Sequence, residues 1–182
     1  MAEASHPPVV KLICGMISSR PEFLDAAAEE LAREFGPVEI TSETMDFDFT
    51  HYYDAEMGTP LFRRFAGFAG TFRPNALAEA KLRTNAIEAE FARRAAAGVA
   101  RPINLDPGYV ESAKLVLASM KNFSHRVYLG RGVYAEVTLT FRRRRWEALP
   151  WTFPDYASGR YDAFLTAVRD RLGAMRSAEV RE

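Results

Sequence analysis

Most of the side chains that could do chemistry lie between residues 104 and 141. His125 and Glu136 are candidates for a catalytic acid and base, because an imidazole and a carboxylate can exchange protons with a bound substrate. Asp106 is a third catalytic candidate, although it could equally accept a backbone N–H within a turn. His125 and Glu136 also allow a structural interpretation, in which the histidine bonds a backbone group and the glutamate pairs with Arg126.

A wider set of polar side chains predicts a site for an anion. Its members are Lys81, Asn85, Asp106, Tyr109, Lys121, Ser124, Arg126 and Glu136. Guanidinium and ammonium groups match the charge and geometry of phosphate and carboxylate. If the helix that carries residues 81 and 85 meets the segment around residue 126, these groups would bind an anionic small molecule or a nucleotide. This is the function that the sequence favours, and it requires no tightly bound cofactor.

Two carboxylates and a histidine raise the question of a metal site. Asp46 and Asp48, with His51 three residues on, could supply oxygen and nitrogen ligands to a divalent cation. The alternative is the solvated face of a half-buried strand, since alternation alone places both aspartates on one side. Together with His125, Glu136 and Asp106, these residues define an alternative function as a metal-assisted or acid–base hydrolase. That function requires carboxylates from distant segments to converge in one cleft.

A basic run, Arg142-Arg143-Arg144-Arg145, suggests a second alternative, an RNA-binding or ribosome-associated module. Such a run is more typical of a solvated hairpin end, and an RNA surface should show an exposed aromatic beside it, for which Trp146 and Trp151 are candidates. The sequence contains no glycine-rich phosphate loop, H-E-x-x-H, G-x-S-x-G or Walker pattern, so those enzyme classes are disfavoured.

The composition limits the partners of the protein. The 182 residues include 24 basic and 24 acidic side chains, so no global field attracts nucleic acid or a membrane. The single cysteine, Cys14, lies in an apolar run and indicates a core residue in a reducing compartment. No stretch approaches the roughly 20 apolar residues that span a bilayer, and the start MAEASHPP has no signal core. A cytoplasmic location is expected, and the oligomeric state is not indicated.

The hydrophobic periodicity predicts one α+β domain over residues 9–175, between a disordered leader (1–8) and a frayed tail (176–182). A strand over 9–17 and a helix over 21–35 are followed by strands over 38–49 and 61–72. The first of these two should break near residues 42–44. A helix over 74–98 and a short strand over 102–105 complete the order β-α-β-β-α-β. This is the order of a ferredoxin-like core, with an antiparallel sheet and helices mainly on one face.

The next segment predicts a turn, a helix and a hairpin that extend the sheet. Asp106-Pro107-Gly108-Tyr109 is typical of a type II turn, and apolar spacing predicts a helix over 110–122. A three-residue loop at 130–132, with Gly132 left-handed, would pair Leu129 with Val133, Val127 with Ala135 and His125 with Val137 on one face. It would pair Tyr128 with Tyr134 and Arg126 with Glu136 on the other. This register assigns a set of apolar side chains to the core face. They are Val127, Leu129, Val133, Ala135, Val137, Leu139 and Phe141.

Several stretches, taken together, are typical of one family. They are KLICGMIS, FGPVEITSETMDFDFTHYYDAEMG, LRTNAIE, INLDPGYV, KLVLASMKNFSHRVYLGRGVYAEVTL and LPWTFPDY. Over about residues 11–172 the chain resembles an uncharacterised bacterial family, domain of unknown function 4416. The resemblance implies a compact bacterial protein with a characteristic DPGY turn. It brings no established activity, so it assigns no catalytic residue.

Overall fold

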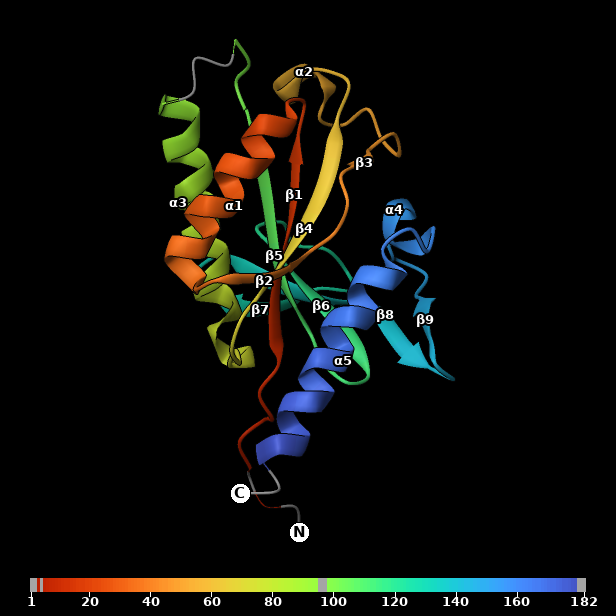
Figure 1. The fold of residues 1–182 in the computed structure, drawn as a ribbon. Helices are drawn as coiled ribbons and strands as arrows, with labels where there is room; N and C mark the ends of the chain where they lie inside the picture. Colours follow the sequence, from red (N-terminus) through yellow and green to blue (C-terminus); the bar gives the residue numbers. More distant parts are fainter. Residues whose placement is uncertain (1–2, 4, 95–97, 180–182) are drawn as a thin grey trace.

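The computed structural model describes residues 3, 5–94 and 98–179 and has an open antiparallel sheet with helices packed against it (Figure 1). The strands are β1 (Lys11–Ser18), β2 (Val38–Thr41), β3 (Met45–Asp46), β4 (Phe62–Phe68), β5 (Asn104–Val110), β6 (Lys114–Ser119), β7 (Val127–Gly130), β8 (Val133–Arg142) and β9 (Arg145–Ala148). The helices are α1 (Pro21–Phe35), α2 (Asp54–Met57), α3 (Leu77–Arg94), α4 (Pro154–Ala157) and α5 (Asp162–Glu179), with a 3-10 turn, η1 (Pro74–Ala76), before α3.

The strands form one sheet in the order β2-β4-β1-β5-β6-β8-β7, while β3 pairs with β4 and β9 pairs with β8. Every pairing between these strands is antiparallel. The predicted α+β class with an antiparallel sheet is therefore confirmed.

None of the helices among the described residues combines the length and the apolar character of a membrane span.

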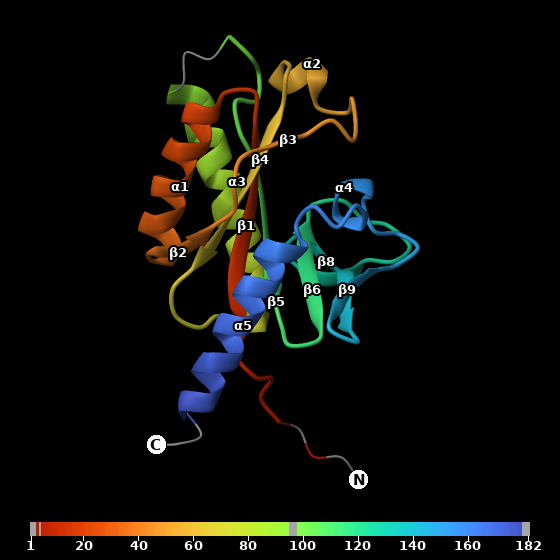
Figure 2. The ribbon, with the colours of Figure 1, turned by 45° about the vertical axis from the view of Figure 1, so that its right-hand side comes forward.

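Helices cover both faces of the central strands. Helices α1 and α3 pack on the face that carries Leu12, Cys14 and Met16, and α5 packs on the face that carries Ile13 and Phe65 (Figure 2). All of β1 is buried, because a strand with apolar side chains on both faces needs a layer on each. The prediction of helices mainly on one face holds for α1 and α3 but is wrong for α5.

Cys14 lies in the core beneath α1 and α3, and its burial raises the pKa of the thiol well above its usual value.

The boundaries of several elements differ from the prediction. The strand predicted over 38–49 is divided into β2 and β3, with the break where it was expected. Helix α3 is described to Arg94, and residues 95–97 of the predicted helix lie outside the described residues. Helix α5 continues to Glu179, beyond the predicted end of the domain at residue 175. Residues 180–182 of the predicted tail, and residues 1, 2 and 4 of the predicted leader, also lie outside the described residues.

The DPGY segment is not a turn but the middle of strand β5. Gly108 pairs with Ile13 of β1 on one side and with Leu117 of β6 on the other. Its φ is not positive, and a Cβ on it would lie 2.5 Å from the Val116 carbonyl oxygen, so the glycine permits close approach of β6. Pro107 is tolerated because the pairing with β6 begins only at Gly108. Pairing with two neighbouring strands therefore overrides the local turn preference.

The helix predicted over 110–122 is also wrong, because residue 110 ends β5 and residues 114–119 form β6. The four central residues of β6 are buried on alternate faces of the sheet. Leu115 and Leu117 pack in the apolar cluster that contains Phe164 and Val168 of α5, the cluster under α5. Val116 and Ala118 pack in the apolar cluster that contains Leu77 of α3, the cluster under α3. A short apolar run that is covered on both sides has no helical or strand periodicity of its own. The spacing of its apolar residues was therefore compatible with either element.

The hairpin register is confirmed near its base and differs at its tip. Val127 pairs with Ala135 and Tyr128 with Tyr134, and Gly132 has a φ of 79°. At the tip, however, Gly130 rather than Leu129 lies opposite Val133. Val127 is 68% exposed and Leu129 is also exposed, because β7 is the last strand of the sheet. The prediction that both residues face the core is wrong.

The odd-numbered residues of β8 lie on one side of the sheet at the start of the strand and on the other side at its end. A register shift in its pairing with β6 separates residues 133–137 from the residues after Thr138. Val133 packs in the cluster under α3, whereas Leu139 packs in the cluster under α5. The predicted apolar face of the hairpin is therefore divided between the two sides of the sheet. The same geometry buries Glu136 on the side opposite to Val133.

Candidate functional site

A cavity of about 560 Å³ lies where the sheet opens between β5 and β6. Strand β5 pairs with β6 only through residues 108–110, whereas residues 104–107 pair with β1 alone. The unpaired part of β5 and the end of β6 line the cavity together with α3, the 47–53 loop, Arg126, β8 and the segment around α4. The cavity gathers six of the eight predicted ligand-binding residues. They are Lys81, Asn85, Asp106, Lys121, Arg126 and Glu136.

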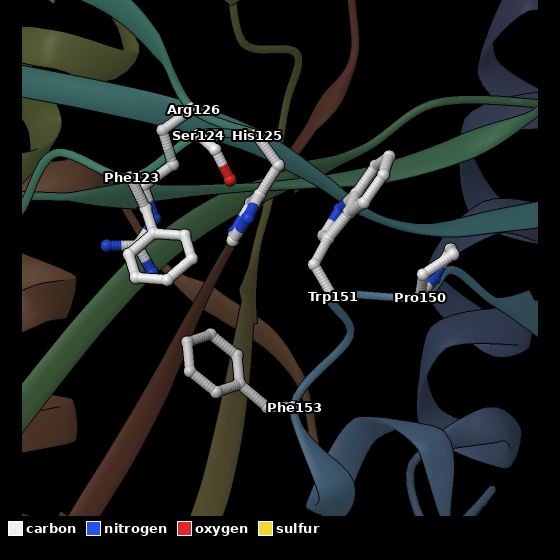
Figure 3. Close-up of a pocket in the computed structure, with 7 residues that line it drawn as sticks. All are labelled: Phe123, Ser124, His125, Arg126, Pro150, Trp151 and Phe153. Atoms are coloured by element: carbon white, nitrogen blue, oxygen red, sulfur yellow. The ribbon is translucent and has the colours of Figure 1, made fainter.

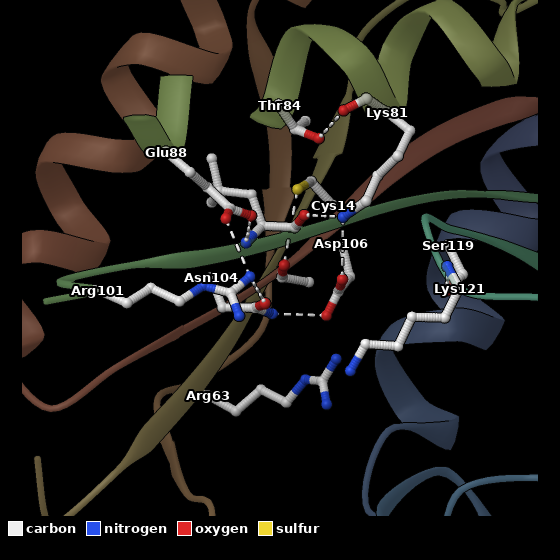
Figure 4. A network of polar contacts seen from close by, with 12 residues as sticks. Cys14, Arg63, Lys81, Thr84, Glu88, Arg101, Asn104, Asp106, Ser119 and Lys121 are labelled. Atoms are coloured by element: carbon white, nitrogen blue, oxygen red, sulfur yellow. Dashed lines mark hydrogen bonds and ion pairs between the residues drawn. The ribbon is translucent and has the colours of Figure 1, made fainter. Parts of the chain in front are cut away.

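A buried polar network forms the wall of the cavity beside α3 (Figure 4). The Lys81 ammonium donates to the Leu105 carbonyl oxygen (2.8 Å) and to Asp106 Oδ1 (3.2 Å). Asn104 Nδ2 donates to Asp106 Oδ2 at 2.6 Å. Burial alone would raise the pKa of Asp106, but Lys81, Arg63 and the Asn104 amide outweigh burial and hold this pKa below its usual value. Asp106 is therefore a fixed carboxylate and a weak base.

Arg101, which lines the cavity, and Glu88, which lies behind the wall, support this network. Arg101 Nη2 donates to Asn104 Oδ1 (2.5 Å) and to Glu88 Oε2 (2.9 Å), and Glu88 Oε1 accepts the backbone N–H of Leu105. Burial raises the pKa of Glu88, although Lys81 and Arg101 act in the opposite direction. These contacts hold Asn104 and Leu105 of β5 against α3 where β6 does not pair with them.

Arg63, on β4, lies on the opposite side of the cavity and is only 4% exposed. Its Nη1 donates to Asp155 Oδ2 (2.5 Å) and its Nη2 to the Tyr156 hydroxyl (3.0 Å). Aromatic rings surround the guanidinium, with those of Phe65 and Tyr156 centred 4.9 Å from it. The Arg63 Nε is buried and has no hydrogen-bond partner among the described residues.

Lys121, in the loop after β6, points its ammonium group into the cavity toward the guanidinium of Arg63 (Figure 4). The ammonium lies 4.4 Å from the centre of the Tyr52 ring and contacts the Tyr52 hydroxyl. Within the described part of the chain, Lys121 forms no ion pair with a carboxylate. Two cationic groups therefore face each other across the cavity.

His125, Arg126 and Glu136 form one hydrogen-bonded group at the other end of the cavity. Glu136 Oε2 accepts from Arg126 Nε at 2.7 Å and shares a hydrogen bond with His125 Nε2 at 2.9 Å. Arg126 Nη1 also donates to Ser119 Oγ and to the Lys121 carbonyl oxygen. The predicted Arg126–Glu136 pair therefore exists, but it is buried and includes His125.

A second, more open cavity of about 680 Å³ adjoins this group (Figure 3). Its lining residues are Phe123, Ser124, His125, Arg126, Pro150, Trp151 and Phe153. The His125 and Trp151 rings are stacked, with centroids 5.3 Å apart and planes 7° from parallel. Arg126 and Phe153 line both cavities, so the two spaces adjoin each other at these side chains.

Two of the predicted ligand-binding residues do not line the first cavity. Ser124 lines the second cavity. Tyr109 lines neither of the two and packs beside the cluster under α3. The reason is that DPGY is a strand, in which Tyr109 faces the side opposite to Asp106, whereas a turn would have allowed both to face one side.

The candidate metal ligands do not converge. Asp46 and Asp48 are exposed, and Arg160 Nη1 donates to Asp48 Oδ1 (3.1 Å) and to the Asp46 carbonyl oxygen (3.2 Å). His51 is exposed and its Nδ1 lies 2.9 Å from Asp54 Oδ2. Among the residues that the structure describes, no group of three or more His, Cys, Asp or Glu side chains could hold a metal ion. These three residues also lie outside the lining of both cavities.

The basic run forms the connection between β8 and β9. Arg143 and Arg144 have φ values of 49° and 64°, as the central residues of a tight hairpin turn do. The adjacent Trp146 is buried, where it packs against Phe141 and donates to Thr166. Trp146 is therefore not the exposed aromatic that the RNA hypothesis requires, and Trp151 lines the second cavity instead.

Sequence reasoning missed the roles of Arg63, Arg101, Asn104 and Asp155. One signal was present, because Arg63 alternates with apolar residues in a strand and an arginine at a buried position needs a partner. That partner, Asp155, is 92 residues away and no local pattern connects the two.

Comparison with known proteins identifies a family and no activity. The model of the family described as Domain of unknown function (DUF4416) matches residues 8–172. No curated protein gives a significant match, and no solved structure does so either.

Proposed function

Because the chain belongs to the DUF4416 family, which carries no assigned activity, we propose a function from the geometry of the site: the protein binds an anionic small molecule in the first cavity. The phosphate or carboxylate group of this molecule lies between Arg63 and Lys121. The observation that carries the proposal is the convergence of these two cationic groups on one space (Figure 4).

The charge balance of the cavity supports an anionic ligand. Five cationic side chains, Arg63, Lys81, Arg101, Lys121 and Arg126, line it with three carboxylates, Asp106, Glu136 and Asp155. Glu88, behind the wall, offsets the charge of Arg101. Three of the remaining cations each pair with one lining carboxylate, which leaves Lys121 without a counter-charge from the described residues.

The fixed position of Arg63 supports the same position for the anion. An anion that accepts from Arg63 and Lys121 would supply the counter-charge that Lys121 lacks among the described residues. Asp155 and Tyr156 hold the guanidinium in place before a ligand arrives, so little side-chain ordering is needed on binding.

The test is a thermal-shift titration of the purified protein with inorganic phosphate, pyrophosphate, sulfate and citrate. A ligand at a hundredfold its Kd adds about 2.7 kcal/mol of stability, so at least one anion should raise Tm in a saturable manner. Sodium chloride at matched ionic strength serves as the control. If no anion raises Tm beyond this control, the proposal is wrong.

The acid–base alternative now depends on His125 and Glu136. Asp46, Asp48 and His51 lie outside both cavities, and Asp106 shares the first cavity with Glu136 but is held by Lys81 and Asn104. The observation in its favour is that the bonded pair lies beside the second cavity, into which His125 projects (Figure 3). Hydrolysis of generic phosphate and carboxylate esters that is lost in His125→Gln would support it. Absence of hydrolysis by the wild-type protein would count against it.

We also infer a ferredoxin-like arrangement for the first two-thirds of the chain. The support is the strand order β2-β4-β1-β5 with α1 and α3 on one face of those strands. The sheet then continues through β6, β8 and β7. The proposed anion site lies at the junction between this part and its continuation.

A further inference from the structure

We propose that the bound anion is a free nucleotide, with its phosphate in the first cavity and its base in the second. This inference rests on the proposed function and specifies the ligand class. The base would lie in the second cavity among Phe123, Trp151 and Phe153, while Arg63 and Lys121 hold the phosphate.

The two cavities adjoin each other. Arg126 follows the loop after β6, and Phe153 precedes α4, yet both residues line both spaces. The Arg126 guanidinium lies 6.0 Å from the centre of the Phe153 ring. A single molecule can therefore place one end in each cavity and pass beside these two side chains.

The chemistry of the second cavity is aromatic. Phe123 is 64% exposed, Phe153 44% and Trp151 39%, so three large rings border the open cavity instead of packing in the core. The His125 ring lies between those of Phe123 and Trp151, so a base would contact the exposed parts of these rings and the Phe153 ring across from them (Figure 3). Trp151 is fixed by its stack on His125 and by the bond from its Nε1 to the Val137 carbonyl oxygen (2.9 Å). Fixed, exposed rings are the usual platforms for nucleobases, because each base has a planar π-face.

The charge around the rings disfavours a cationic ligand. The charged side chain among the lining residues is Arg126, whose Nε and Nη1 already donate to Glu136 and Ser119. No carboxylate lines this cavity among the described residues, so a cationic ligand such as a methylated ammonium would find aromatic rings but no counter-charge there. A neutral planar base that is attached to an anionic phosphate fits both cavities.

The burial of Arg63 distinguishes a free nucleotide from a polymer. Arg63 is almost completely buried, and aromatic rings surround its guanidinium. A terminal phosphate can reach such a group, whereas an internal phosphate of an RNA strand would have to bring the neighbouring nucleotides with it. The ligand is therefore a mononucleotide with a free terminal phosphate.

The experiment is calorimetric titration of the whole protein with AMP, GMP, CMP and UMP, each compared with ribose 5-phosphate. At least one nucleotide should bind about tenfold more tightly than the sugar phosphate, since stacking of a base on aromatic side chains is worth that much or more. Phe123→Leu and Trp151→Leu should each remove most of this advantage and leave the affinity for ribose 5-phosphate unchanged. Tyr128→Leu, an exposed ring outside both cavities, is the matched control and should change neither affinity.

The outcomes separate this inference from the proposed function. If ribose 5-phosphate binds as tightly as every nucleotide, the base assignment is wrong and anion binding stands. If none of these probes binds and none of phosphate, pyrophosphate, sulfate and citrate raises Tm, both proposals are overturned. If a 5′-phosphorylated RNA hexamer binds more tightly than the mononucleotides, the ligand is an RNA end and the free-nucleotide assignment is wrong.

Discussion

The Nε of Arg126 lies 2.7 Å from the carboxylate of Glu136, and only 2% of the Glu136 side chain is exposed. The two residues lie on segments joined by the β7–β8 hairpin, and Arg126 lines both cavities. The ion pair therefore has a structural role and a position in the proposed site. Because the Arg126–Glu136 pair is buried, its contribution to stability and to the site depends strongly on the Glu136 carboxylate.

Glu136→Gln should lower the free energy of unfolding by about 3 kcal/mol, because it leaves a buried guanidinium without its counter-charge. The measurement is urea denaturation at pH 7. The matched control is Glu147→Gln, which breaks the more exposed pair with Arg145 and should cost less than about 1 kcal/mol. Equal losses in the two variants would show that the burial of the Arg126–Glu136 pair has no energetic consequence.

Lys121→Gln should abolish or strongly weaken the Tm increase caused by the anions that stabilise the wild-type protein, while the Tm without ligand changes little. The reason is that Lys121 is exposed, has no carboxylate partner among the described residues and points toward Arg63. Lys114→Gln is the control, since Lys114 is the first residue of β6, at the end of that strand away from Lys121, and pairs with Glu111. An identical anion response in both variants would place the anion elsewhere.

Gly108→Ala should destabilise the protein by about 1 to 3 kcal/mol, as overpacking does in well-packed interiors. The added Cβ would lie 2.5 Å from both the Val116 carbonyl oxygen and Leu117 Cδ2. Gly173→Ala is a control of opposite sign, because a Cβ there meets no atom within 4 Å and alanine is about 0.5 to 1 kcal/mol better in a helix. If Gly108→Ala were neutral in thermal and chemical unfolding, β5 and β6 would not approach as closely as described.

Acid should reduce the stability that Asp106 contributes. The pKa of Asp106 is lower in the folded protein than its ordinary value of 3.8, so the folded state binds fewer protons at this group than the unfolded state. The contribution is complete above pH 3.8 and is lost as the pH falls through the folded pKa. Asp106→Asn should be less stable than wild type at pH 7 by about 3 kcal/mol, because Lys81 loses its partner.

The measurement for Asp106 is the difference in unfolding free energy between the two proteins at pH 7, 5, 4 and 3. This difference should stay constant from pH 7 to 5 and shrink below about pH 4. A difference that widens as the pH falls would mean that the pKa of Asp106 is raised by folding instead of lowered.

Local patterns were sufficient where one segment determines its own structure. The apolar run of β1, the long helices α1 and α3 and the paired strands around Gly132 all follow from spacing and turn chemistry. The register of that hairpin brings Arg126 beside Glu136, so this part of the site could be predicted. The predicted anion site requires the helix that carries residues 81 and 85 to meet the segment around residue 126. In the structure these three residues line one cavity.

The sequence by itself determined the antiparallel α+β class, the hairpin pairing near its base and six of the side chains that line the cavity. Only the tertiary structure decided that DPGY is a strand, that Tyr109 faces away from Asp106, and that Arg63 meets Asp155 across 92 positions. The physical reason is that strand pairing and ion pairing between distant segments outweigh local preferences, and neither leaves a periodic signal in the residues involved. The cavity exists because β6 pairs with β5 only over residues 108–110 and leaves residues 104–107 without a partner on that side. Pairing with β1 and the bond from Lys81 of α3 to the Leu105 carbonyl oxygen hold these residues in place instead.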